Sequence, residues 1–308
     1  MFRAARFLSF VLCLSTLPCA QLSLAQQSDP VPLQLAQMSS TNIYTRVAAF
    51  YGLLRLAPQP SGTTGVPSIS DSTSALLALY PTDRTAIVSA LGSLLGTELT
   101  DGSLATLMST PTDETPVDFC LDLIQAVVAL NDVSTIPSLV AALPNGAMVT
   151  DRLASFGPVA VDPVAAAVYN DDVTVRHAAA FTLMTMLQPQ FANLYSEPTS
   201  QSKIRAGLTL AIRSFAGPFA SLGAFFQTFV NTLPAQVPGD LNGDGVVNCA
   251  DLQLVIAAQG TKVGQLGFDI RADLDGDGHV TGLDFSTESK LVAAAMGIPP
   301  GQVVSTCK

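Results

Sequence analysis

Two twelve-residue stretches near the C-terminus share one pattern of oxygen-bearing side chains, and this repeat constrains the fold more than any other feature. In the first stretch, residues 240–251, these side chains stand at positions 1, 3, 5, 9 and 12, and Gly245 stands at position 6. The second stretch, residues 273–284, fills every one of those positions again, with Gly278 at position 6. The duplication predicts two copies of one small structural unit.

Oxygen side chains at alternate positions are the ligands that a hard divalent cation requires. Ca²⁺ takes about six to eight oxygens, and a glycine at position 6 permits the sharp turn that brings the position-7 carbonyl to the ion. Mg²⁺ demands a tighter octahedron and keeps more water, so the pattern favours calcium. The candidate ligands are Asp240, Asn242, Asp244, Val246 (carbonyl), Asn248 and Asp251 in the first loop, and Asp273, Asp275, Asp277, His279 (carbonyl), Thr281 and Asp284 in the second.

The alternative to a calcium site is an acidic turn that binds no metal. One such loop would fit that alternative, whereas two complete copies in register favour the ion. Without a cation, the carboxylates gathered in each loop would repel one another at close range. We therefore expect this part of the chain to fold only when calcium is present.

Each loop is followed, but not preceded, by a helical pattern. Residues 252–258 and 285–296 are apolar at helical spacing and end near Gly260 and Gly297. Pro238 and Gly239 exclude a helix directly before the first loop, and only a short segment, residues 268–272, precedes the second. The repeated unit is therefore a loop followed by a helix.

Two such units within about seventy residues resemble a type I dockerin domain, over residues 238–308. The resemblance implies two calcium loops with antiparallel helices, with the ligands given above. It also implies a protein partner, because dockerins dock onto the cohesin domains of scaffolding proteins.

The chain departs from the dockerin pattern on the expected docking face. Cohesin-recognising dockerins often carry Ser-Thr at loop positions 10 and 11 and a basic pair further along the helix. Here positions 10 and 11 are Cys249-Ala250 and Gly282-Leu283, and the later positions hold Ala257-Ala258 and Lys290-Leu291. The two faces differ from each other, so the sequence argues against symmetric docking through either one, and a cohesin partner is a hypothesis.

The first 25 residues have the pattern of a secretory signal peptide. Arg3 and Arg6 precede an apolar run, residues 7–17, that is too short to span a bilayer, and Ser23-Leu24-Ala25 supplies small residues before a cut. A buried first helix is the alternative. We expect a secreted protein cleaved after Ala25, and the cut would change the formal net charge from −10 to −12.

Three cysteines would remain after this cleavage: Cys120, Cys249 and Cys307. An oxidising compartment favours one disulfide and one spare thiol. In the dockerin arrangement the C-terminal tail returns near the first loop, so the resemblance implies a Cys249–Cys307 bridge; two independent thiols are the alternative. Cys120 lies in an apolar helical segment and is expected to be a buried free cysteine.

The middle of the chain predicts an all-α domain over residues 41–234, after a flexible segment at 26–40. Apolar residues recur at helical spacing, and helices are expected at 117–130, 138–143, 164–168 and 173–187, with Asp162 as the N-cap of the third. Pro234 and Pro238 mark the boundary, because two prolines four residues apart do not fit one regular helix. The dockerin-like module would then span 235–308.

The helical hairpins of this domain partly repeat. Arg46, Arg152, Arg176 and Arg205 each stand near the start of an apolar helix, and residues 117–226 resemble HEAT-like repeats. The arginine spacing is shorter than the ~40–47 residues of standard HEAT units, so an irregular helical bundle is an equal alternative.

Composition excludes several partner classes. Charged residues make up 12% of the chain, the net charge is −10 and basic runs are absent, so nucleic acid and anionic membranes are poor partners. No nucleophile, zinc or phosphate-loop motif occurs. His177 favours a structural role, and the ring of His279 is expected to face solvent.

Two hypotheses follow for the function. The first is a non-catalytic secreted protein with a helical interaction surface, attached to a partner through the dockerin-like module. The second is an unrecognised polysaccharide-degrading enzyme or accessory subunit, because dockerins commonly accompany glycoside hydrolases. The absence of tryptophan removes the usual sugar-stacking platform and favours the first hypothesis.

Overall fold

The computed structural model describes residues 29–57, 67–100, 115–215 and 219–307. Within these ranges the protein is all-α, as the sequence predicted. Among the described residues, β-type pairing is limited to one isolated antiparallel bridge between Lys262 and His279. The predicted signal peptide lies outside the described residues.

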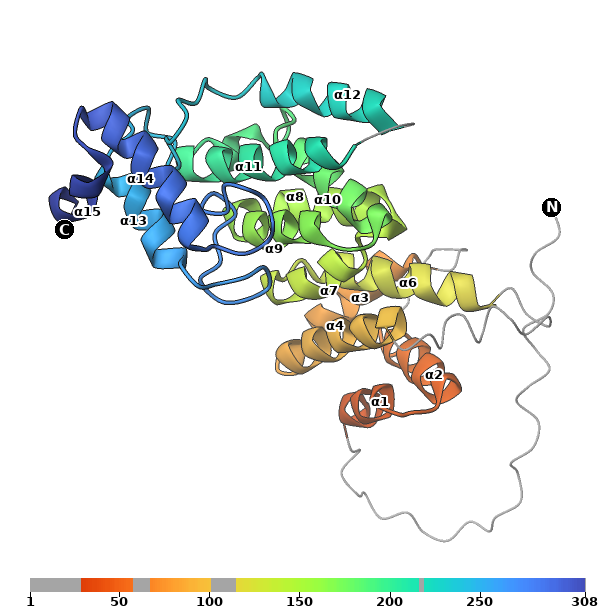
Figure 1. Cartoon of the computed structure of the whole chain (residues 1–308). Helices are drawn as coiled ribbons and strands as arrows, with labels where there is room; N and C mark the ends of the chain where they lie inside the picture. Colours follow the sequence, from red (N-terminus) through yellow and green to blue (C-terminus); the bar gives the residue numbers. More distant parts are fainter. Residues whose placement is uncertain (1–28, 58–66, 101–114, 216–218, 308) are drawn as a thin grey trace, which may run out of the picture.

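The helices of the N-terminal part stack on one another in chain order. From α1 and α2 at one end, the stack continues through α4, α6 and α7 to α10, α11 and α12 at the other (Figure 1). The described helices are α1 (Pro30–Met38), α2 (Ile43–Leu54), α3 (Ile69–Leu79), α4 (Arg84–Thr100), α6 (Thr115–Leu130), α7 (Ile136–Ala141), α8 (Ala147–Ser155), α9 (Val161–Ala166), α10 (Val173–Met186), α11 (Pro198–Ser214) and α12 (Ala220–Val230), with short 3-10 turns between several of them.

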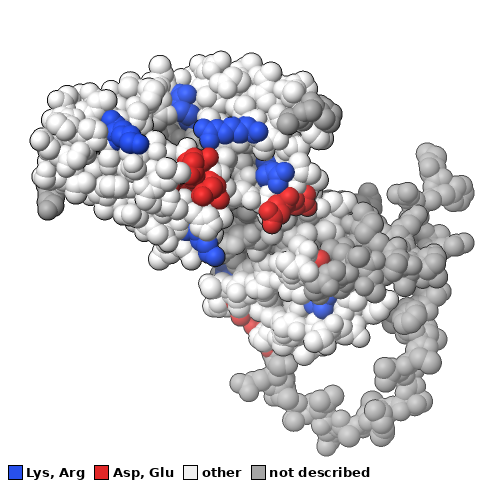
Figure 2. Space-filling view, viewed as in Figure 1, with Lys and Arg blue, Asp and Glu red and all other residues white. Residues whose placement is uncertain are grey.

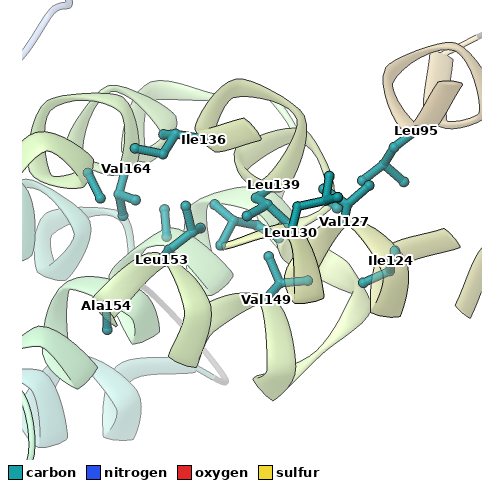
Figure 3. Close-up of a cluster of buried hydrophobic side chains, with 14 of the residues drawn as sticks. Leu95, Ile124, Val127, Leu130, Ile136, Leu139, Val149, Leu153, Ala154 and Val164 are labelled. Atoms are coloured by element: carbon teal, nitrogen blue, oxygen red, sulfur yellow. The ribbon is translucent and has the colours of Figure 1, made fainter. Parts of the chain in front are cut away.

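A continuous apolar core runs through this stack. Figure 3 shows Leu95 and Val127 from α4 and α6 at one end of a row of buried side chains, Leu139 and Val149 in the middle and Val164 of α9 at the other. Each short helix presents one apolar face, so burial requires the next hairpin along the chain. This dependence on neighbours explains why helices of only six residues persist in the fold.

Two of the four arginines expected near helix starts, Arg46 and Arg176, do stand there and share a local device. The expectation was wrong for Arg152, which lies in the last turn of α8, and for Arg205, which lies inside α11. Asn42 caps α2 and Asp172 caps α10. The arginine four residues after each cap donates hydrogen bonds to two backbone carbonyls that precede the helix. Arg46 donates to the carbonyls of Ser40 and Thr41. Arg176 donates to those of Asn170 and Asp171. The two turns are fixed in the same way, although the resemblance to HEAT repeats stays a prediction.

Two local expectations differ from the structure. The segment 26–40, expected to be flexible, contains α1, because Asp29 caps a helix whose Val31 is fully buried against the stack. Asp162 does not cap a helix: α9 begins one residue earlier, and the Asp162 carboxylate pairs with Lys203 of α11 instead.

The C-terminal module sits against one side of the stack, beside α9 and α11 (Figure 1). Its helices are α13 (Cys249–Ala258), α14 (Gly282–Met296) and the short α15 (Val303–Thr306), and α13 packs on α14. Two small apolar clusters, one around Leu252 and Val292 and one around Val255 and Val280, form its core. No described helix is both long and apolar enough to cross a membrane.

Candidate calcium-binding site

The first acidic loop is curled around its own carboxylates. Asp240 accepts hydrogen bonds from the backbone N–H groups of Gly243 and Gly245 at 2.8 and 3.0 Å. Asp251 closes the loop by accepting from the N–H groups of Leu241 and Asn248 at 2.8 and 2.9 Å. The side chains at positions 1 and 12 are thereby buried and held at fixed places.

The second loop repeats this arrangement with one more carboxylate. Asp273 accepts from the N–H groups of Gly276 and Gly278, and Asp284 accepts from that of Leu274 at 2.8 Å. Ligand oxygens of Asp273, Asp275 and Asp277 all lie within 4.8 Å of one another. Three carboxylates so close together fit a divalent cation, whose charge would offset their repulsion.

The last two ligand positions of each loop also start a helix. Asn248 and Thr281 are the N-caps of α13 and α14, and Asp251 and Asp284 complete a capping box in each case. Because α13 and α14 begin inside the loops, each is one turn longer at its N-terminus than the apolar pattern predicted.

Position 6 requires glycine in both loops. The backbone φ angles of Gly245 and Gly278 are +88° and +86°, in the left-handed region that side chains with a Cβ rarely adopt. Of the sequence-predicted ligands, the structure brings the carboxylates of Asp273, Asp275 and Asp277 together, and the His279 ring is exposed, as expected.

Residues 238–289 match the family model of the dockerin type I domain. The C-terminal part of the chain is therefore a type I dockerin domain, a class that binds calcium and serves attachment to protein partners. The match covers well under half of the chain and leaves the helical domain unassigned. No curated protein and no solved structure matches this chain.

The disulfide implied by the dockerin resemblance is present. Cys249, at position 10 of the first loop, is joined to Cys307 in the C-terminal tail. Gln253 of α13 donates a hydrogen bond to the Cys307 carbonyl at 2.8 Å. The tail is therefore fixed over the first turn of α13. Cys120 is free, as expected, but it is only partly buried, and burial raises the pKa of its thiol.

His177 takes the structural place that was expected of it. Its ring packs against those of Phe215 and Phe219, with centroids 4.6 and 5.1 Å apart. Burial and the nearby Arg176 charge lower the pKa of His177.

One buried carboxyl escaped the sequence analysis. Glu288 of α14 is fully buried, and neither of its oxygens has a hydrogen-bond partner. Burial and repulsion by Asp251 and Asp240 raise the pKa of Glu288 to about 8. Glu288 stands four residues after the end of its loop, where the first repeat has the core residue Val255. This break in the repeat was the available signal.

Replacing Glu288 by leucine is expected to stabilise the module by about 2 kcal/mol, because the change removes an unpaired polar group from the core. Because the pKa of Glu288 is higher in the folded state than in the unfolded state, the folded module loses stability as pH rises from the ordinary pKa of a carboxyl towards 8. The gain should therefore grow between about pH 5 and about pH 8. Thermal unfolding in calcium-saturated buffer measures it.

Glu288→Gln is the matched control for this prediction. It keeps the shape and polarity of the side chain but removes the ionisation, so it should flatten the pH dependence without the full gain in stability. A lower unfolding temperature for Glu288→Leu at both pH values would contradict the prediction. It would mean that the calcium-loaded loop depends on the charge of Glu288.

Proposed function

We propose that this protein is secreted, is not an enzyme, and presents its helical domain on a partner to which the dockerin domain attaches it. The match of residues 238–289 to the dockerin type I domain carries the proposal. The predicted signal peptide, residues 1–25, supports secretion.

The dockerin domain is proposed to hold two calcium ions, one in each loop. The donor set supports two sites, because both loops supply oxygen side chains at positions 1, 3, 5, 9 and 12 on the same backbone framework. A bound ion supplies positive charge that holds these oxygens together. The loop residues themselves fix the ends of each loop and cap the first turns of α13 and α14.

The partner is proposed to bear a cohesin domain and to bind the α14 face. In the first turn of α14, Leu283 is 60% exposed and Gly282 is also exposed. The corresponding turn of α13 contains Cys249, which is tied to the C-terminal tail. Only one of the two related faces is therefore free of the tail, which supports a single docking orientation.

Leu283→Asp is expected to weaken cohesin binding by at least about 2 kcal/mol, because it places a charge in an apolar contact. Ala250→Asp, at the same position of the first loop, is the matched control and should change binding little. Pull-down and calorimetry against cohesins from the same genome measure both. Equal losses from the two variants would reject the single orientation, and no binding to any of these cohesins would reject the partner.

Two acidic side chains of the helical domain are held in contacts with its own residues, which supports a non-catalytic helical domain. Glu98 pairs with Arg46 inside the core, and Asp122 accepts a hydrogen bond from Tyr51. The alternative, a polysaccharide-degrading enzyme, requires two carboxylates across a cleft. Release of sugars from a panel of plant polysaccharides by the purified chain would favour that alternative.

A further inference from the structure

Helix α11 of the helical domain lies across both calcium loops. A Cβ added to Gly243, at position 4 of the first loop, would stand 3.0 Å from the Pro198 carbonyl oxygen at the start of α11. A Cβ added to Gly276, at position 4 of the second loop, would stand 2.8 Å from Leu210 Cδ1 near its end. The two loops therefore approach opposite ends of one helix, and at position 4 of each loop a side chain would require α11 or the Leu210 side chain to shift.

The segment between the loops is part of the same interface. Ile270 is buried in the core of the helical domain, and a Cβ on Gly207 of α11 would lie 3.7 Å from its Cδ1. Arg271 is also buried, pairs with Asp269 at 2.6 Å and points towards the Leu241 carbonyl at 3.4 Å. The dockerin domain is thus packed into the stack rather than tethered beside it. In Figure 2, acidic and basic side chains lie next to one another near the middle of the face in view.

One side chain of the helical domain reaches a calcium ligand directly. Tyr169, at the end of the 3-10 turn that follows α9, donates a hydrogen bond from its hydroxyl to Oδ2 of Asp273 at 2.7 Å. Its ring packs edge-on against Phe268, with centroids 5.7 Å apart. A Cβ on Gly278 would lie 3.4 Å from the same ring. The Tyr169 ring is therefore held between Phe268, which precedes the second loop, and Gly278 within it.

Asp273 stands at position 1 of the second loop, where the ligand set begins. Its two oxygens accept from the N–H groups of Gly276, Asp277 and Gly278, and Tyr169 adds a fourth donor from outside the dockerin domain. The first loop has Asp240 in the same position.

We propose that the helical domain completes the second calcium site of the dockerin domain, with Tyr169 as the positioning residue that orients Asp273 for the ion. The inference rests on the proposed function, since it presumes that the second loop binds calcium. Partners that orient a metal ligand from outside the coordination shell typically affect metal affinity by about 10–100-fold. Because coupling is reciprocal, calcium in this loop strengthens the packing of the dockerin domain on the helical domain by the same factor.

Calcium titration by calorimetry on the full chain tests this proposal with one loop active at a time. Asp244→Ala removes an exposed ligand of the first loop and leaves the second to report, and Asp277→Ala does the reverse. Adding Tyr169→Phe should weaken binding about tenfold or more in the Asp244→Ala background. The same change should leave binding in the Asp277→Ala background unaltered.

A second readout does not depend on the single-loop variants. The chain has no tryptophan, so tyrosine is the side chain that sensitises luminescence of bound Tb³⁺. Tyr169→Phe should remove most of this emission. Tyr195→Phe is the matched control, because Tyr195 is buried and its hydroxyl donates to the Ala154 carbonyl instead of a loop.

The outcomes separate this inference from the proposed function. A loss confined to the second loop, together with the loss of Tb³⁺ emission, supports it. Unchanged affinity, or an equal loss in both backgrounds, overturns the role of Tyr169 and leaves calcium binding intact. If the unaltered chain binds no calcium, the proposed calcium function itself is rejected.

Discussion

In the presence of a chelator, the backbone amides of α13 and α14 are expected to lose most of their protection from hydrogen exchange, while those of α4 and α10 keep theirs. The reason lies in the charges. The loops carry three and four carboxylates respectively, and without an ion their repulsion is opposed by backbone N–H groups and a few side-chain donors such as Tyr169. Because both helices begin inside the loops, a loop that opens also removes the helix cap.

Hydrogen exchange followed by mass spectrometry on the full chain measures this loss, with the helical stack as the internal control. Calcium added back should restore protection, and magnesium at the same concentration should restore less, since it requires a tighter octahedron. Full protection of α13 and α14 in chelator would contradict the dependence on calcium. It would show that the disulfide and the contact with α11 suffice to hold the module.

Removal of the Cys249–Cys307 disulfide is expected to cost about 4 kcal/mol of module stability, because the bridge closes a loop of 58 residues in the unfolded chain. Cys307 also contributes to the apolar cluster of Val292 and Val303. The double change Cys249→Ser with Cys307→Ser should therefore lower the denaturant midpoint of the module and leave that of the helical domain nearly unchanged.

Cys120→Ser is the matched control for the disulfide, because Cys120 has no covalent partner and lies outside the module. It should not change the stability of the module. Denaturant unfolding in calcium-saturated, non-reducing buffer distinguishes the two variants. If reduction of the unaltered chain left the module as stable as before, the entropic account of this bridge would be wrong.

The dockerin domain was predictable because its information is local. A ligand pattern of twelve residues specifies the turn, the positive φ at Gly245 and Gly278 and the cap of the following helix, all within one loop. The bridge from Cys249 to Cys307 needed more than spacing, and it came from the resemblance to dockerins. Glu288 was missed because its burial depends on how α14 packs, although its mismatch with Val255 was visible in the repeat.

The helical domain was predicted only in its general class. Helical spacing gave α10 nearly to the residue, and the apolar faces required a stack. The order of packing was not predictable, because one apolar helix face fits many partners. Asp162 shows the limit: it looked like a cap before a proline, yet the structure uses it to pair with Lys203.

By itself, the sequence determined that the chain is all-α and ends in a dockerin domain with two acidic loops, because these properties depend on residues close together in the chain. Only the tertiary structure decided what lies against the loops. The hydrogen bond from Tyr169 to Asp273 joins residues 104 positions apart, and no periodicity or motif marks it. Such contacts arise from the packing of whole surfaces, here α11 against two glycine-lined loops, and that packing makes the helical domain a neighbour of the predicted calcium ligands.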